Sequence, residues 1–195
     1  YRGSTKEHSD PLMRTYLEDL IYRLSETSEV RDRRFEFIIL EDKSINAFAA
    51  PGGIIGINLG MFLNTKREGE LASVMCHELA HLSQRHYARS QNRSSPLANA
   101  LMILGSIAVA AASRNPEAIM IAPAAMQQMS INYTRSNEKE ADRIGFNNLV
   151  KAGFDPNDMT MMFQRMQDKY QREGSEQFSY LMTHPLPSER LTDMR

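Results

Sequence analysis

The sequence Val-Met-Cys-His-Glu-Leu-Ala-His-Leu at residues 74–82 constrains the fold more than any other stretch. On an α-helix, His77 and His81 are one turn apart and project from the same face. Two imidazoles at this separation can bind one zinc ion, at about 2.0–2.1 Å each. Glu78 lies close to such a metal but is badly placed to ligate it, as expected of a general base acting on water that the metal activates. The motif therefore predicts a metallohydrolase site; the alternative is a helix with two solvated histidines.

A third ligand is expected downstream, from another helix. Glu138 and Asp142 are four residues apart and share one face of the helix predicted around them. We expect Glu138 to bind the metal and Asp142 to accept the free ring N–H of a ligand histidine, which fixes the tautomer of that ring. Glu140 is expected to face elsewhere as a solvated charge. Without the histidine motif, this segment would be interpreted as an exposed acidic helix.

Two more histidines lie near these motifs in the sequence. His86 is five residues beyond His81 and is predicted to face away from the metal, at the surface. His184 lies in a proline-rich segment, which predicts a stiff chain rather than a regular helix. Three roles remain open for His184: stabilising a tetrahedral oxyanion, filling the fourth zinc position when no substrate is bound, or packing as an ordinary loop histidine.

Apolar spacing predicts an α+β fold that is mainly helical. Residues 12–24 have helical periodicity, with Asp10 as N-cap and Pro11 at the first helical position. Further helices are expected over residues 59–64, over residues 68–87, which include the histidine motif, and around Glu138, ending at Gly153. The next helix should begin after Phe154-Asp155-Pro156 and run through Met166, and Ser188 should cap a final one.

Short strands are expected over residues 35–40, 45–49 and 54–58, with a turn at residues 51–53. They predict a small, largely antiparallel sheet beside the motif helix. The segment Asn46, Ala47, Phe48 and Ala49 has mostly small side chains, and an edge of this kind can pair with an extended peptide. We therefore predict that these four residues bind a polypeptide substrate.

Composition limits the classes of protein to consider. The length of 195 residues, 42% hydrophobic, predicts a single domain over residues 1–195. A net charge of −1 without a basic block argues against a nucleic-acid partner. The single cysteine, Cys76, excludes an internal disulfide and is expected to be a small core residue. The chain starts at Tyr1, which suggests a processed or trimmed product whose signal peptide, if it had one, is outside the sequence.

Two apolar stretches lie between the motifs. Residues 97–112 are shorter than the roughly 20 residues needed to span a bilayer, so a core helix or a hydrophobic flap is favoured over membrane insertion. Residues 119–129 are rich in Met and Ala and are interpreted as core, with a pliable surface for apolar ligands as the alternative. Peripheral membrane contact by residues 97–129 stays open.

Together these residues resemble a known family, the gluzincin endopeptidases of the HtpX and CAAX-prenyl-protease group (peptidase family M48). The motifs that carry the resemblance are His77-Glu78-x-x-His81, Glu138-x-x-Ala141-Asp142 and residues 46–49, 84–86 and 183–187, and the similarity covers residues 12–195. The closer match is to the soluble periplasmic branch of the family. The resemblance implies a zincin-like metalloprotease domain with one Zn2+ per chain, bound by His77, His81 and Glu138, with Glu78 as base.

The resemblance also implies a place and a task. It implies a periplasmic endopeptidase that helps or clears outer-membrane proteins and meets their assembly machinery. In that family the histidine matching His184 can approach the metal and hold the site shut. Relatives carry a tetratricopeptide domain after the protease, and this sequence ends where such repeats would begin. Two alternatives remain: a chaperone-like module that holds unfolded barrel strands on the same edge, and a structural zinc domain, which usually has four protein ligands and no adjacent free carboxylate.

Overall fold

The computed structural model describes residues 6–91, 135–173, 179–185, 190 and 192. The predictions for residues 97–112 and 119–129 and for Ser188 lie outside the described residues. The elements are α1 (Pro11–Thr27), β1 (Glu36–Leu40), β2 (Ala47–Ala50), β3 (Ile54–Asn58), α2 (Leu59–Asn64), α3 (Glu68–Ser83), α4 (His86–Gln91), α7 (Arg135–Lys151), α8 (Asn157–Glu173) and α9 (Ser179–Thr183). The domain is mainly helical with one small sheet, as the sequence predicts.

The sheet is mixed, with the strand order β1-β3-β2. β2 and β3 are antiparallel, as expected, but β1 and β3 are parallel, so the expectation of a largely antiparallel sheet is corrected for β1. After β1 the chain crosses to the far edge of the sheet as β2. A tight turn then returns it as β3, which lies between β1 and β2 and pairs with both. Gly52 and Gly53 have φ values of 92° and 83°, and a side chain on Gly53 would collide with the Arg34 carbonyl oxygen. The predicted turn at residues 51–53 is therefore confirmed.

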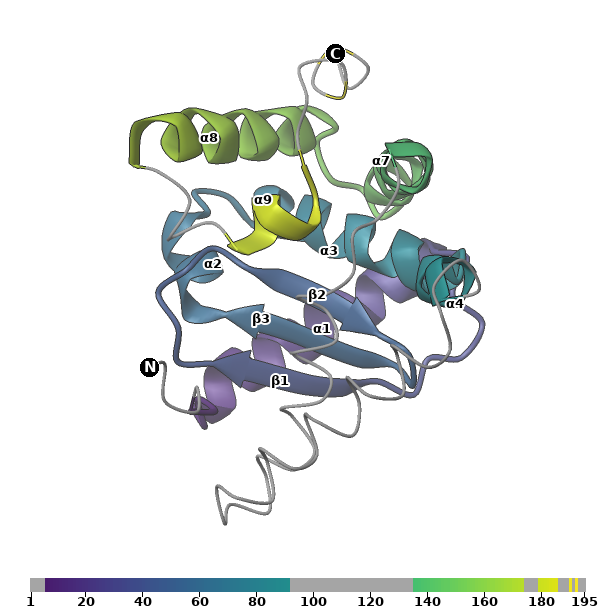
Figure 1. Cartoon of the computed structure of the whole chain (residues 1–195). Helices are drawn as coiled ribbons and strands as arrows, with labels where there is room; N and C mark the ends of the chain where they lie inside the picture. Colours follow the sequence, from purple (N-terminus) through teal and green to yellow (C-terminus); the bar gives the residue numbers. More distant parts are fainter. Residues whose placement is uncertain (1–5, 92–134, 174–178, 186–189, 191, 193–195) are drawn as a thin grey trace.

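The helices pack together with one face of the sheet. α3 lies next to β2, while α7 and α8 pack against α3 (Figure 1). Alternate strand residues belong to this shared core, among them Ile39, Ala47 and Ile57, and α1 contributes apolar side chains such as Ile21. Ile38, Leu40 and Phe48 form a smaller cluster on the other face. This arrangement holds α3, and the motif on it, against the edge strand of the sheet.

Helix ends follow the predicted signals at α1 and α7. The Asp10 side chain accepts hydrogen bonds from the amides of Leu12 and Met13, and Pro11 opens the helix. Gly153, at a φ of 82°, terminates α7. Among the described residues, no helix is both long and apolar enough to cross a membrane.

The helix with the histidine motif ends earlier than predicted. α3 stops at Ser83 instead of continuing to residue 87. The Gln84 amide still reaches the Ala80 carbonyl, but the Arg85 amide donates to Leu82, and Arg85 adopts a φ of 52°. This left-handed residue is unusual for a non-glycine side chain and redirects the chain into α4. The break changes the position of His86, with consequences for the metal centre.

A buried ion pair joins α3 to α8. Both guanidinium nitrogens of Arg165 donate to the two carboxylate oxygens of Glu70, at 2.6 and 2.5 Å, and the Lys66 amide donates to the same carboxylate at 2.6 Å. Burial alone would raise the pKa of Glu70, but the hydrogen bonds from Arg165 and Lys66 outweigh it and lower the pKa. The pair therefore fixes the position of α3 relative to α8 with an ionised glutamate.

We expect Glu70→Gln to lower the free energy of unfolding by about 3 kcal/mol, near the small end of the range for a broken buried pair because Arg165 keeps some contact with solvent. Urea unfolding at neutral pH measures this value. The control is Glu18→Gln, which removes a partly exposed pair with Arg14 and should cost less than about 1 kcal/mol. Equal losses in the two variants would contradict a stabilising role for the ion pair between Glu70 and Arg165.

The same pair makes a pH prediction. Because folding lowers the pKa of Glu70, its stabilisation is fully present above the pKa of an unfolded glutamate and is lost as the pH falls through the lowered value. The stability difference between wild type and Glu70→Gln should therefore shrink in acid.

Candidate metal centre

α3 brings His77 and His81 together as their spacing predicts. Both side chains are buried, their ring centroids are 4.6 Å apart, and their Nε2 atoms are 2.9 Å apart. Glu78 is fully buried between α3 and β2, and its Oε2 accepts a hydrogen bond from the Ala49 amide at 3.3 Å. The helix therefore presents two imidazole nitrogens to one point, with a carboxylate beside them.

α7 crosses α3 closely enough to add the predicted carboxylate. Glu138 is buried, with Oε1 3.3 Å from His81 Nε2 and Oε2 3.5 Å from His77 Nε2. The close crossing depends on Gly145, where a Cβ atom would lie 3.0 Å from the backbone nitrogen and Cα of His77. Sequence reasoning did not identify Gly145, because a glycine inside a helix gives no sign of which helix it will contact.

His184 joins the same cluster from the end of α9. Its amide donates to the Tyr180 carbonyl at 2.8 Å, and its ring stacks on the Tyr180 ring with centroids 4.6 Å apart. His184 Nδ1 is 3.1 Å from Glu138 Oε1 and 3.4 Å from His77 Nε2. His184 is thus a buried member of the cluster. Tyr180, which the sequence analysis did not consider, supports its ring.

The four side chains fit a single metal ion. One possible ligand atom from each of His77, His81, Glu138 and His184 lies within 4.8 Å of the others, and all four side chains are buried. Three imidazole nitrogens and one carboxylate oxygen are a donor set that suits zinc in tetrahedral geometry. Glu78 Oε1 is buried and has no hydrogen-bond partner among the described residues. A bound ion would use the clustered ligand atoms, and a water molecule on that ion would give Glu78 Oε1 a hydrogen-bond partner.

Burial and neighbouring charges shift the pKa values of Glu78 and Glu138 in opposite directions. Burial raises the pKa of Glu78, although His184 and His77 act against that rise. Burial also tends to raise the pKa of Glu138, but contacts with His184, His77 and His81 outweigh it and hold the pKa well below its usual range. Glu138 is therefore kept ionised, as a metal ligand must be, while Glu78 has the higher proton affinity that suits a base.

Asp142 lies behind one histidine of the motif, and that histidine is His77. Its Oδ1 is 3.0 Å from His77 Nδ1, the ring nitrogen that faces away from the cluster. A buried arginine that sequence reasoning missed lies behind Asp142. Arg190 donates to both Asp142 oxygens at 2.7 and 2.8 Å and approaches Glu138 Oε2 at 2.7 Å. It also donates to the Pro185 carbonyl, next to His184, so it links the two carboxylates of α7 to the His184 segment.

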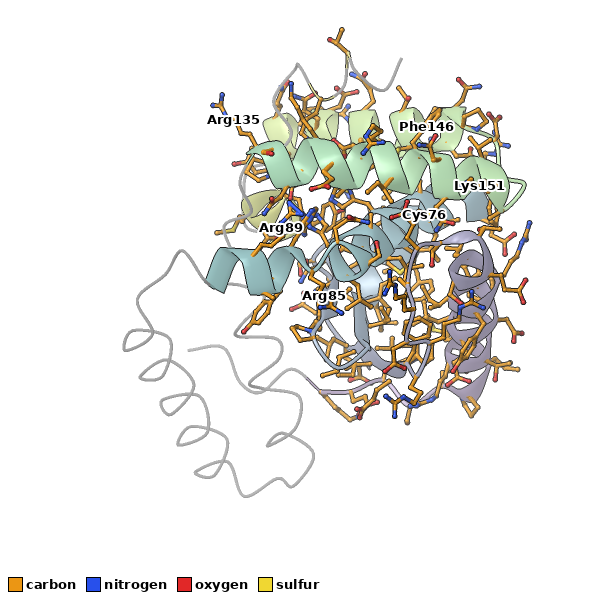
Figure 2. The ribbon with its side chains drawn as sticks, turned by 90° about the vertical axis from the view of Figure 1, so that its right-hand side faces the viewer. Cys76, Arg85, Arg89, Arg135, Phe146 and Lys151 are labelled. Carbon is orange, nitrogen blue, oxygen red and sulfur yellow. The ribbon has the colours of Figure 1, made fainter. Side chains whose placement is uncertain are left out.

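The predicted surface position of His86 is wrong, whereas Glu140 lies outside the cluster and is partly exposed, as predicted. His86 is fully buried, and its Nδ1 is 2.8 Å from His81 Nδ1. Its Nε2 is 3.0 Å from Glu140 Oε2, which also pairs with Arg89 at 2.7 Å. Figure 2 shows Arg89 between α4 and α7. The predicted surface position assumed one continuous helix, whereas the break at Arg85 turns His86 back towards His81.

β2 forms the wall of the site next to Glu78. The Asn58 amide donates to the Asn46 carbonyl, so in this antiparallel register Asn46 and Phe48 turn their hydrogen-bonding groups towards β3. Ala47 and Ala49 turn theirs to the edge that no other strand of the described sheet pairs, and the Ala49 amide reaches Glu78 there. The predicted edge therefore borders the cluster, although Asn46 itself precedes the strand.

A cleft of about 590 Å³ opens at the end of β2. Its walls include Ala49, Gly52, His81 and Arg85, so it extends from the turn between β2 and β3 to a histidine of the cluster. Both charge signs occur on its rim, with Arg31 beside acidic residues. Among the clustered side chains, His81 is the one that the described cleft touches.

Two histidines one turn apart, the adjacent buried glutamate and a carboxylate from a second helix define the metallopeptidase class of site. The chain belongs to Peptidase family M48, whose family model matches residues 11–195. The family resemblance seen in the sequence is thereby confirmed.

Several relatives have names that describe their roles. The beta-barrel assembly-enhancing protease of Escherichia coli K12 is 40% identical over 100% of this chain and 40% of its own length, and a Vibrio cholerae relative is 46% identical over 96% of this chain and 39% of its own length. The mitochondrial metalloendopeptidase OMA1 of Schizosaccharomyces pombe is 27% identical over 98% of this chain and 56% of its own length. This chain spans about 40% of the length of the two bacterial relatives.

Proposed function

We propose that this chain is a zinc-dependent endopeptidase. The observation that carries the proposal is the buried cluster of His77, His81, Glu138 and His184 with Glu78 beside it. His77, His81 and Glu138 would hold the zinc ion. When bound, zinc supplies a Lewis acid that lowers the pKa of water towards neutrality and polarises a carbonyl group.

The residues of the chain supply the proton transfers and the orientation. Glu78 accepts a proton from the attacking water at its carboxylate and returns it to the leaving amine. The Ala49 amide, 3.3 Å from Glu78 Oε2, orients that carboxylate before reaction. Asp142 Oδ1 lies 3.0 Å from His77 Nδ1, and its negative charge favours the ring hydrogen on that nitrogen, which leaves the Nε2 lone pair directed at the cluster.

The substrate proposed for this site is an extended polypeptide lying along β2. The backbone groups of Ala47 and the carbonyl of Ala49 face the edge of β2 that no described strand pairs, and an extended chain can pair with them there. Asn46 and Phe48 turn their backbone groups towards β3 instead. Because main-chain pairing is insensitive to side chains, cleavage specificity is expected to be modest. The cleft beside Ala49 accommodates the chain where it passes His81.

The names of the bacterial relatives support a physiological setting. We propose that the substrates are misassembled or unfolded outer-membrane and periplasmic proteins, that the chain works in the periplasm, and that it meets the outer-membrane assembly machinery. The proposal rests on similarity at 40% identity to proteins named for β-barrel assembly.

The metal assignment can be tested by crystallography at the zinc edge. We expect one zinc ion per chain, bound by His77, His81 and Glu138. Zinc bound elsewhere, or protein that binds no zinc when it is supplied, would contradict the proposal. The fourth position distinguishes two states of the site: a water molecule indicates a competent protease, and His184 indicates a latent one.

We further propose that His184 holds the site latent. His184 Nδ1 is 3.1 Å from Glu138 and its Nε2 is 3.6 Å from Glu78 Oε1, so the ring lies between a proposed ligand and the proposed base, where the attacking water is needed. Removing the ring should therefore raise the basal activity. An expected gain of about 10-fold corresponds to about 1.4 kcal/mol of relieved competition.

The measurement is hydrolysis of an unfolded protein substrate by His184→Ala, with zinc content determined in parallel. His8→Ala is the matched control, since His8 is remote from the cluster and pairs with Glu41. Loss of activity in His184→Ala with zinc retained would instead assign His184 to the transition state.

A further inference from the structure

A hydrogen-bonded chain extends outward from His81. Beginning at the cluster, His81 Nδ1 is 2.8 Å from His86 Nδ1, and His86 Nε2 is 3.0 Å from Glu140 Oε2. Arg89 Nη2 completes the chain, 2.7 Å from the same glutamate oxygen. Four side chains from α3, α4 and α7 thus form one chain of polar contacts. The reaction proposed above gives a role only to His81, the first of them.

The positions of the hydrogens follow from chemistry. His81 Nε2 faces the cluster, 2.9 Å from His77 Nε2 and 3.3 Å from Glu138, so a metal can bind this atom only when the ring hydrogen is on Nδ1. Between two nitrogens 2.8 Å apart only one hydrogen fits. His86 Nδ1 must therefore accept the hydrogen of His81, and His86 must carry its own hydrogen on Nε2.

Glu140 makes this arrangement the favoured one. An ionised carboxylate can only accept hydrogen bonds, so Glu140 requires a hydrogen on His86 Nε2. Arg89 keeps the carboxylate ionised and in place. Glu140 thus fixes the tautomer of His86, and His86 in turn fixes the tautomer of His81.

We propose that His86 and Glu140 are positioning residues that fix the tautomer and orientation of His81 for metal binding. The proposal rests on the zinc site proposed above. His77 obtains the same support from Asp142 directly, at 3.0 Å, whereas His81 obtains it through an intervening imidazole. Partners of this kind typically change metal affinity or activity by about 10–100-fold when removed.

Three variants test the proposal. His86→Leu fills the space without an acceptor, so its zinc dissociation constant should rise about 10–100-fold in chelator competition. In His86→Asn, the side-chain oxygen takes the place of Nδ1 and can accept from His81, so most of the affinity should return. His8→Leu is the control, because it removes a histidine that pairs with Glu41 outside the cluster, and its affinity should equal that of wild type.

A measurement on the unmutated protein avoids the question of whether variants fold. Nitrogen-15 NMR of the zinc-loaded wild type should show a hydrogen on Nδ1 of His81 and a hydrogen on Nε2 of His86. The chain has five histidines, which makes the assignment practical. The opposite tautomer on His86 would overturn the proposal.

The outcomes separate this proposal from the proposed function. A wild-type protein that binds no zinc overturns the proposed function and, with it, the support for His81. If wild type binds zinc and His86→Leu binds it equally well, only the support role is overturned. If His86→Asn loses as much affinity as His86→Leu, an acceptor at this position does not restore zinc binding, and the tautomer assignment is wrong.

Discussion

Glu78→Gln is expected to lower kcat/KM for peptide hydrolysis by about 10²–10⁴-fold, the usual contribution of a general acid–base residue. Glutamine has the size of glutamate and can still accept a hydrogen bond from the Ala49 amide, which lies 3.3 Å from the carboxylate. It cannot take a proton from water at neutral pH. Zinc content should be unchanged, because Glu78 is not among the four side chains whose atoms could hold a metal ion. Hydrolysis of an unfolded protein, with zinc measured on the same sample, checks both statements.

The matched control is Glu26→Gln, which makes the same substitution at an exposed position of α1. Its activity should equal that of wild type. A Glu78→Gln protein with near-normal turnover would end the proposed mechanism.

The same variant tests the chaperone-like alternative. The edge of β2 is unchanged by the substitution, so binding of unfolded polypeptide should survive while cleavage is lost. If Glu78→Gln prevents aggregation of an unfolded outer-membrane protein as well as wild type, holding is independent of proteolysis. If wild type cleaves and neither protein holds substrate, the holding function is excluded.

Helical spacing explains why the sequence predicts the centre of the site. His77 and His81 are separated by four residues within a continuous helix, and the geometry of that helix alone places both rings on one face. Glu138 and Asp142 follow the same rule in α7, which is also continuous. The spacing predicts that Asp142 lies one turn from Glu138, near a motif histidine, but only the packing of α7 on α3 selects His77.

Helical spacing no longer predicts which residues lie together once a helix ends. Helical spacing places His86 relative to His81 only if the helix continues, but α3 stops at Ser83 and Arg85 redirects the chain at a φ of 52°. No glycine marks the break, so the usual signal of a left-handed residue is missing. The parallel pairing of β1 is a second failure, because alternation within a strand indicates its faces but not its neighbours.

Arg190 shows a third limit, since its partners lie far away in the sequence. A single arginine after a proline-rich segment has the pattern of an exposed residue, yet it is 2% exposed and contacts Asp142, 48 residues earlier. Only the tertiary fold places two buried carboxylates at that point. A buried arginine becomes predictable once the need to balance Glu138 and Asp142 is known.

Arg190→Met is expected to lower the free energy of unfolding of the zinc-free protein by about 3–5 kcal/mol. Methionine retains much of the side-chain volume but leaves Asp142 and Glu138 without the guanidinium that contacts both. Zinc would neutralise part of the charge on Glu138. The loss should therefore be smaller in the zinc-loaded protein, with Asp142 accounting for what remains. Urea unfolding with and without zinc measures the two values.

Two comparisons make this prediction specific. Arg14→Met removes a half-exposed arginine that pairs with Glu18 and should cost less than about 1 kcal/mol. Arg190→Lys keeps the charge but lacks the planar fork that donates to both Asp142 oxygens, so its loss should lie between those of wild type and Arg190→Met. Equal losses for Arg190→Met relative to wild type with and without zinc would show that Arg190 supports Asp142 alone. A loss no greater than that of Arg14→Met would show that the buried contacts of Arg190 contribute nothing to folding.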